Sequence, residues 1–171
     1  MSNKRSEVFY RVLSNPYLNN KNFKKIFNDI RKNIDINGYD ECNYTPLMNS
    51  ICHSLNYLNT TKRIELILQN GADPNKRGGY GMYSPILLAI SNKEMSTHIV
   101  KLLIKYKCTI NEESIWKCAM GGRIDVLDIL EYNYDGKIRD ICDEKGRNLL
   151  DYAKLFDRND KFLKELEKRL K

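Results

Sequence analysis

Residues that commonly build metal and catalytic centres are scarce in this chain of 171 residues. It holds two histidines, His53 and His98, and five cysteines without a single C-x-x-C pair. Zinc ribbons and disulfide frameworks need closer and more regular spacing than this. The adjacent Cys52 and His53 could in principle join a third cysteine at a zinc ion, but nothing in the spacing favours such a site. We therefore expect no metal, no cofactor and no enzymatic activity.

Long hydrophobic runs are also missing from the sequence. The longest uncharged stretch, residues 42–61, includes asparagine, proline and histidine and is too polar to span a membrane. The first seven residues are polar or charged apart from the initial methionine, and they lack the apolar core of a secretory signal. We expect a cytoplasmic chain whose cysteines are reduced, most of them filling small apolar sites.

Charge is abundant but unevenly distributed. Apolar residues make up 42% of the chain and charged residues 30%, a balance typical of one folded domain. The formal net charge is +7, of which residues 1–33 carry +6 and residues 34–171 only +1. The basic end is interpreted either as a solvated end-cap of the fold or as a patch that binds nucleic acid or an acidic partner.

Short patterns recur along the chain. Residues 34–37, 72–75 and 108–111 end alike, and their closing asparagines lie 38 and 36 residues apart. Residues 44–47 and 83–86 also begin alike, with a tyrosine, a hydroxyl residue and a proline. Between these motifs, apolar residues recur at helical spacing. The sequence therefore predicts repetition of one helical unit.

These motifs resemble the ankyrin-repeat family, whose unit is a β-turn followed by two helices with a T-P-L-H-x-A signature. Thr45-Pro46-Leu47-Met48 and Ser84-Pro85-Ile86-Leu87 stand at the signature, and Gly71-Ala72-Asp73-Pro74-Asn75 matches the family's closing G-A-D-x-N. The hydroxyl residue suits a helix cap, proline its first turn, and glycine the end of the next helix. The resemblance implies an all-α repeat protein, an ankyrin-type solenoid of about five helix-turn-helix pairs with short β-turn hairpins.

One repeat domain is expected over residues 1–171. Its parts are a basic capping helix pair over residues 1–37, repeats over residues 38–75, 76–111 and 112–140, and a capping repeat over residues 141–171. Extra residues are expected between the helices of the first two full repeats and in the glycine-rich turn of the second. Glu113 takes the place of the capping threonine in the third repeat and follows Asn111 by two residues. That spacing is too short for a hairpin, so this repeat is expected to lack one.

Repeat solenoids present an extended surface whose general use is protein binding. The resemblance implies that contacts come from the hairpin tips and from the inner face of each first helix. Tyrosine suits such tips, because it combines apolar area with a hydrogen-bonding group and few rotatable bonds. The expected partner-binding residues are Tyr39, Glu41, Tyr44, His53, Arg77, Tyr80, Met82, Tyr83, Ser91, Asn92, Met120, Lys145 and Arg147.

The sequence thus predicts a non-enzymatic protein–protein interaction module, monomeric when free, that binds a partner protein. Abundant Asn, Lys, Ile and Tyr suggest an AT-rich coding source, and by analogy the chain is interpreted as a viral or bacterial host-interaction factor. The alternative is binding of nucleic acid or an acidic partner through the basic N-terminal cap, although no groove-reading motif supports it. Trp116 stands in place of the signature histidine and is expected to pack between repeats.

Overall fold

The structure is a computed structural model that describes residues 9–13, 15, 18–53, 60–92, 97–156 and 158–171. These residues form α-helices and two short 3-10 helices, and they contain no β-strand beyond two isolated bridges. The all-α class predicted from the sequence is therefore confirmed. The insertions expected near residues 52–61 and 94–97 fall largely outside the described residues.

Contacts within the chain divide it into two compact units. Unit 1 comprises Met1–Ala89 and Glu94–Cys108, and unit 2 comprises Ile90–Lys93 and Thr109–Lys171. Unit 1 contains α2 (Asn20–Ile30), η1 (Arg31–Asn33), α3 (Pro46–Cys52), α4 (Thr60–Gln69), most of α5 (Pro85–Ser91) and α6 (Thr97–Lys105). Unit 2 contains α7 (Glu112–Gly121), α8 (Ile124–Asn133), η2 (Ile138–Asp140), α9 (Leu149–Leu155) and α10 (Asp160–Leu170).

In unit 1, α3 begins and α4 ends where the motifs place them. The Thr45 hydroxyl accepts a hydrogen bond from the backbone N–H of Met48 at 3.3 Å, and Pro46 takes the first position of α3. Gly71 follows α4 with a φ of 90°, the left-handed conformation that glycine adopts without steric cost. The local signals for this helix pair are therefore confirmed.

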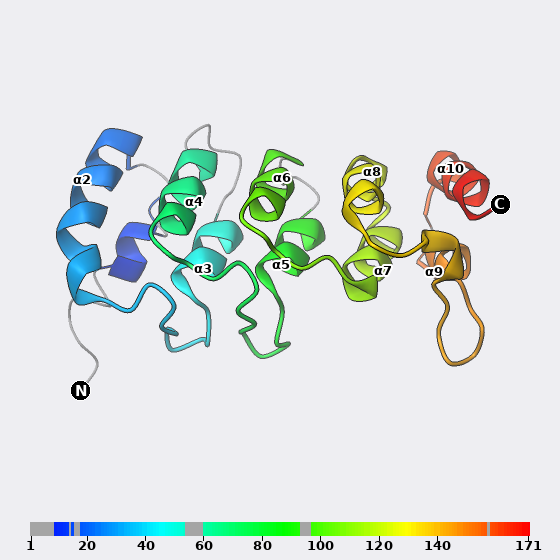
Figure 1. Cartoon of the computed structure of the whole chain (residues 1–171), viewed down its shortest axis with the longest axis horizontal. Helices are drawn as coiled ribbons and strands as arrows, with labels where there is room; N and C mark the ends of the chain where they lie inside the picture. The colour runs from blue at the N-terminus through cyan, green and yellow to red at the C-terminus, as the bar shows by residue number, and fades with distance from the viewer. Residues whose placement is uncertain (1–8, 14, 16–17, 54–59, 93–96, 157) are drawn as a thin grey trace. The chain divides into compact units, whose positions relative to one another are not determined.

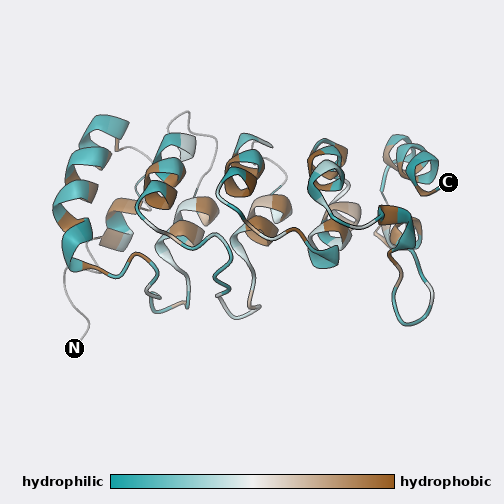
Figure 2. Ribbon diagram, viewed as in Figure 1, coloured by the Kyte–Doolittle hydropathy of each residue, from teal (hydrophilic) through white to brown (hydrophobic). Residues whose placement is uncertain are grey.

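Apolar side chains on facing sides of the helices hold unit 1 together. α4 packs against α2, α3 and α6, and Figure 1 shows α2, α4 and α6 side by side in one row with α3 in a second. Figure 2 shows hydrophobic residues gathered on the facing sides of these helices. Side chains at most 1% exposed include Phe23, Phe27, Leu47, Ile51, Ile64 and Ile67. Burying one such side chain contributes roughly 1.5–3 kcal/mol, so this core is the main source of stability.

In unit 2, α7 begins directly after Asn111. The Asn111 side chain accepts from the backbone N–H of Ser114, and the Ser114 hydroxyl accepts from the backbone N–H of Asn111, both at 3.2 Å. The predicted absence of a hairpin between Asn111 and Ser114 is therefore confirmed. Glu113, which stands where the family has its threonine, does not cap the helix, because this reciprocal pair starts the helix earlier and places Glu113 in its first turn.

Trp116 of α7 packs edge-on against Tyr152 of α9, with ring centroids 4.5 Å apart. Aromatic pairs in this geometry are stabilising beyond the area that they bury. Trp116 thus contributes to helix packing within unit 2, as predicted.

The prediction that most cysteines fill small apolar sites is wrong. Cys108 and Cys118 are buried, whereas Cys42, Cys52 and Cys142 are exposed. Burial raises the pKa of the Cys108 thiol to about 12 and also raises the pKa of Cys118, so both stay protonated at neutral pH. The exposed cysteines lie in loops or at a helix end, where helical periodicity does not determine burial.

Candidate functional site

Two loops of unit 1 carry most of the expected contact residues. In the first, residues 38–44, the Asp40 carboxylate accepts hydrogen bonds from the backbone N–H groups of Cys42 and Tyr44 at 2.9 and 2.8 Å. Its other oxygen accepts from the Asn49 side chain of α3 at 2.7 Å. One aspartate therefore fixes the shape of this loop and ties it to the helix that follows.

The second loop, residues 77–83, is closed by its own backbone. Gly78 and Tyr83 form an antiparallel bridge, with N–H···O=C bonds of 2.9 and 2.8 Å in the two directions. The Arg77 Nε donates to a carbonyl of the same loop, and Gly79 makes the reversal with a φ of 68°. The backbone thus sets the loop geometry, and most of the side chains at its tip are left to project outward.

The two loops are joined to each other, and together we call them the paired loops. The backbone N–H of Gly79 donates to the Asn43 carbonyl at 2.7 Å, and the Tyr39 hydroxyl donates to the Arg77 carbonyl at 2.7 Å. A Cβ atom added to Gly78 would lie 2.3 Å from the Asn43 carbonyl oxygen. Only glycine allows such a close approach of the two backbones.

Large apolar side chains are exposed on the paired loops. We call four of them the loop patch: Tyr80 (89% exposed), Met82 (57%), Tyr39 (46%) and Tyr83 (37%). The ammonium group of Lys76 lies over the Tyr39 ring, 4.4 Å from its centroid. Aromatic side chains on an already ordered backbone offer contact area at a low entropic cost of binding.

Tyr44 lies between the loops rather than at a tip. It is half-buried, and a Cβ atom added to Gly79 would lie 3.0 Å from its ring. Burial, followed by charge interactions with Cys52 and Cys42, raises the pKa of its hydroxyl. We therefore assign Tyr44 a supporting role under the second loop.

The other expected residues of unit 1 lie on or near the paired loops. Glu41 is exposed in the first loop, and Arg77 is half-buried at the base of the second. His53 is exposed but lies outside α3, as its C-cap. Its predicted position within the helix is wrong, because α3 ends at Cys52.

Three expected residues belong to unit 2 at the end of α5 and on α7. Ser91 is the exposed last residue of α5, and Met120 is half-buried on α7. Asn92 is half-buried, and its carbonyl accepts a hydrogen bond from the Arg123 guanidinium at 2.8 Å. These residues therefore form no continuous loop surface comparable to the loop patch of unit 1.

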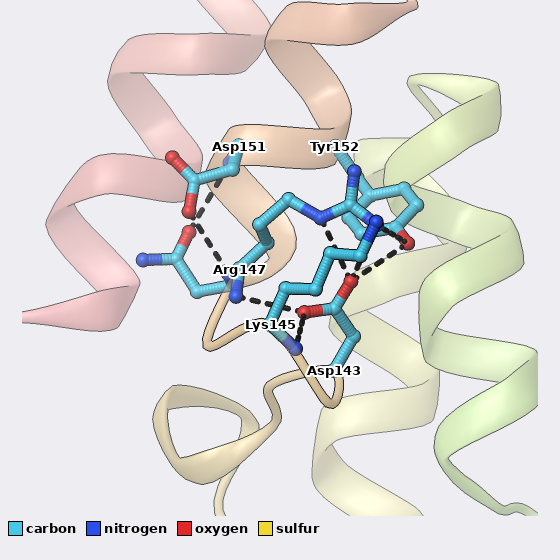
Figure 3. A network of polar contacts seen from close by, with 6 residues as sticks. Asp143, Lys145, Arg147, Asp151 and Tyr152 are labelled. Atoms are coloured by element: carbon cyan, nitrogen blue, oxygen red, sulfur yellow. Dashed lines mark hydrogen bonds and ion pairs between the residues drawn. The ribbon is translucent and has the colours of Figure 1, made fainter.

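Lys145 and Arg147 lie in a loop of unit 2 whose polar contacts are drawn in Figure 3. The Asp143 carboxylate accepts from the Arg147 Nε at 2.8 Å and from the Tyr152 hydroxyl at 3.1 Å. It also accepts from the backbone N–H groups of Lys145 and Arg147, each at 2.9 Å. Desolvation alone would raise the pKa of Asp143, but these hydrogen bonds outweigh it and hold the pKa well below its usual range. The Arg147 guanidinium is thus engaged inside its own loop, whereas Lys145 is exposed.

Sequence reasoning missed two residues that shape the paired loops. Asp40 organises the first loop, and Lys76 covers the Tyr39 ring. An aspartate that can bond to backbone two residues ahead is a recognised turn signal, so Asp40 could have been found. The position of Lys76 depends on how neighbouring loops pack, for which the sequence holds no signal.

Comparison with models of known protein families finds no match to this chain, and comparison with curated proteins finds none either. Within the described part of the chain, no group of three or more His, Cys, Asp or Glu side chains is arranged to hold a metal ion. Among the same residues, no helix combines the length and apolar character needed to cross a bilayer. The functional argument therefore rests on the geometry of the paired loops.

Proposed function

We propose that this chain is an ankyrin-type repeat protein that binds a partner protein through the paired loops, without catalysis of its own. The packing of α3 with α4 and of α7 with α8 supports a repeat of helix pairs. The Thr45 cap and the left-handed Gly71 lie at the motif positions of the family that the sequence resembles. A role as a viral or bacterial host-interaction factor remains a prediction from composition.

The loop patch carries this proposal. Tyrosine and methionine are enriched in the cores of protein interfaces, and a few such anchors supply most of the binding energy. Tyr80 is 89% exposed on a loop held by backbone hydrogen bonds, so its ring has no packing role that explains its presence. Because the loops are already ordered, little conformational entropy is lost when a partner covers them.

Site-specific photo-crosslinking tests the proposal directly. Tyr80 and Tyr132 are both 89% exposed, but Tyr132 lies on α8 and provides a matched control. p-Benzoylphenylalanine placed at position 80 should form a discrete adduct in a lysate that contains the partner, and the same probe at position 132 should not. Equal labelling at both positions, or an adduct only at position 132, would refute binding through the paired loops.

A second candidate is binding of nucleic acid or an acidic partner through the basic end of unit 1. Lys21, Lys24 and Lys25 are all exposed on α2. Such binding would weaken steeply with added salt, because neutralised phosphates release counterions. Binding centred on the loop patch should change little over the same range of salt, so a salt titration of the captured complex separates the two.

A further inference from the structure

Unit 1 contains a buried arginine that has no carboxylate partner among the described residues. Arg63 of α4 is 7% exposed, and its Nη1 donates to the Asn15 carbonyl at 2.7 Å. Its Nε and Nη2 are buried and have no hydrogen-bond partner among the described residues. The guanidinium lies 4.9 Å from the centroid of the Phe23 ring. A ring face attracts the cation, but it does not replace oxygen acceptors for two buried N–H groups.

Arg123 in unit 2 shows what such a guanidinium binds elsewhere in the same chain. It is also 7% exposed, and its Nη1 also donates to a backbone carbonyl, that of Asn92, at 2.8 Å. Its Nε and Nη2, however, donate to the two carboxylate oxygens of Asp125 at 2.9 and 2.8 Å. This pairing raises the pKa of Arg123, whereas burial lowers the pKa of Arg63. The Nε and Nη2 that Asp125 satisfies in Arg123 have no acceptor in Arg63 within the described part of the chain.

The surroundings of Arg63 supply space and positive charge. It lines a cavity of about 220 Å³ between α2 and α4, together with Lys24 and Lys62. One water molecule needs roughly 10–15 Å³ of such volume, so the cavity has room for a polyatomic ion. Glu65 is the carboxylate among the lining residues, and it is ion-paired with Lys105 of α6 at 3.1 Å. The lining residues therefore carry three positive charges and one negative charge, and that negative charge is already paired with Lys105.

We propose that Arg63 is the centre of an oxyanion site that holds a phosphate group through Nε and Nη2, with Lys24 and Lys62 neutralising its charge. The planar edge of a guanidinium matches two oxygens of a phosphate. The two negative charges of a phosphate dianion also balance more of the charge of Arg63, Lys24 and Lys62 than the one charge of a carboxylate would. Both nitrogen atoms are shielded from water, so the proposed binding requires the guanidinium to turn toward the cavity. This site is independent of the paired loops.

The phosphate group belongs either to the free ion or to an organic phosphate monoester, and a calorimetric titration separates the two. The whole chain is titrated with inorganic phosphate and with phenyl phosphate, at an ionic strength kept constant with chloride. We expect saturable binding with a dissociation constant on the order of 1 mM or tighter for at least one of them. The tighter probe identifies the source of the group. Absence of saturable binding by both probes would overturn the proposal.

Variants locate the site. Arg63→Met keeps the side-chain length, removes the donor edge and should abolish the binding. If that variant does not fold, Lys24→Gln/Lys62→Gln decides the matter, with an expected loss of affinity of about 10-fold. The control is Lys21→Gln/Lys25→Gln, which removes the same charge from exposed positions of α2 that do not line the cavity. Equal affinity in the two double variants would refute the assignment.

Discussion

The second of the paired loops and the loop that contains Lys145 are closed in the same way, but their side chains differ. The first exposes apolar side chains, and the second binds its arginine side chain to its own carboxylate. Each is closed by an isolated antiparallel bridge, Gly78 with Tyr83 in unit 1 and Cys142 with Asn148 in unit 2. In unit 1 the neighbouring loop adds one backbone hydrogen bond and one from the Tyr39 hydroxyl, whereas in unit 2 the Asp143 carboxylate accepts from the backbone and Arg147 of its own loop and from Tyr152 of α9. A loop supported from outside can expose apolar side chains such as Tyr80 and Met82 at its tip.

The side chains of the two loops differ accordingly. The loop patch exposes tyrosine and methionine, whose apolar area gains free energy only when a partner covers it. In unit 2, Arg147 and Tyr152 are already engaged with Asp143. Recruiting Arg147 to a partner would require breaking a charge-assisted hydrogen bond, so this loop is better suited to holding its own shape.

The largest effect on stability is expected from closing the gap between the paired loops. Gly78→Ala places a Cβ 2.3 Å from the Asn43 carbonyl oxygen, a backbone atom that cannot move aside alone. We expect a loss of about 3 kcal/mol in the free energy of unfolding, measured by urea denaturation.

Gly146→Ala in the loop of unit 2 is the matched control for that variant. Gly146 has a φ of 73°, and nothing lies within 4 Å of the added Cβ. Only backbone strain remains, and it should cost about 1–2 kcal/mol. A smaller loss in Gly78→Ala than in Gly146→Ala would contradict the contact between the paired loops.

A smaller, pH-dependent effect is expected from Asp143→Asn. Folding holds the pKa of Asp143 below its unfolded value of about 3.9. The stability that the Asp143 carboxylate contributes is therefore complete above about pH 5, and it is lost as the pH falls below the unfolded pKa toward the lower pKa of the folded state. The variant should have a lower melting temperature near neutral pH and a weaker dependence on acid. An unchanged acid dependence would show that Asp143 does not hold this loop.

The smallest effect is expected from Tyr39→Phe, which removes the hydroxyl that donates to the Arg77 carbonyl at 2.7 Å. The loss of this exposed hydrogen bond should cost about 0.5–1 kcal/mol in the free energy of unfolding. Tyr106→Phe, at a half-buried tyrosine of unit 1, serves as the comparison. If Tyr39→Phe lost more free energy of unfolding than Gly78→Ala, the Tyr39 side chain rather than the backbone would be what joins the two loops.

Local signals in the sequence were sufficient for several elements of the fold. Thr45 and Pro46 indicate the start of α3, and Gly71 indicates the end of α4, because each acts through its own backbone or an immediate neighbour. The family position of the threonine, here Glu113, does not mark the cap of α7, because a reciprocal pair formed by Asn111 and Ser114 provides it. Two capping signals compete there, and the residue pair that satisfies both backbone donors starts the helix.

The candidate site was predicted less completely, since its geometry depends on contacts between segments distant in sequence. Tyrosines at the tips could be expected from the repeat pattern, but the support given by Tyr44 and the hydrogen bond from Gly79 to Asn43 could not. For the same reason, no pattern distinguishes the engaged Arg147 from an exposed basic residue. The missing acceptors of Arg63 likewise become visible only when its neighbours are in place.

The affinity of a Tyr80→Ala/Tyr83→Ala variant for the captured partner tests the central claim most directly. Losing a buried aromatic anchor typically costs about 2 kcal/mol or more, so we predict a loss of roughly 30-fold or more with a nearly unchanged melting temperature. Tyr132→Ala should bind like the unmodified chain. Lys21→Glu/Lys25→Glu should alter mainly the association rate and its salt dependence. Normal binding by the double tyrosine variant, with binding abolished by the lysine reversal, would contradict the account and make the basic end of unit 1 the functional site.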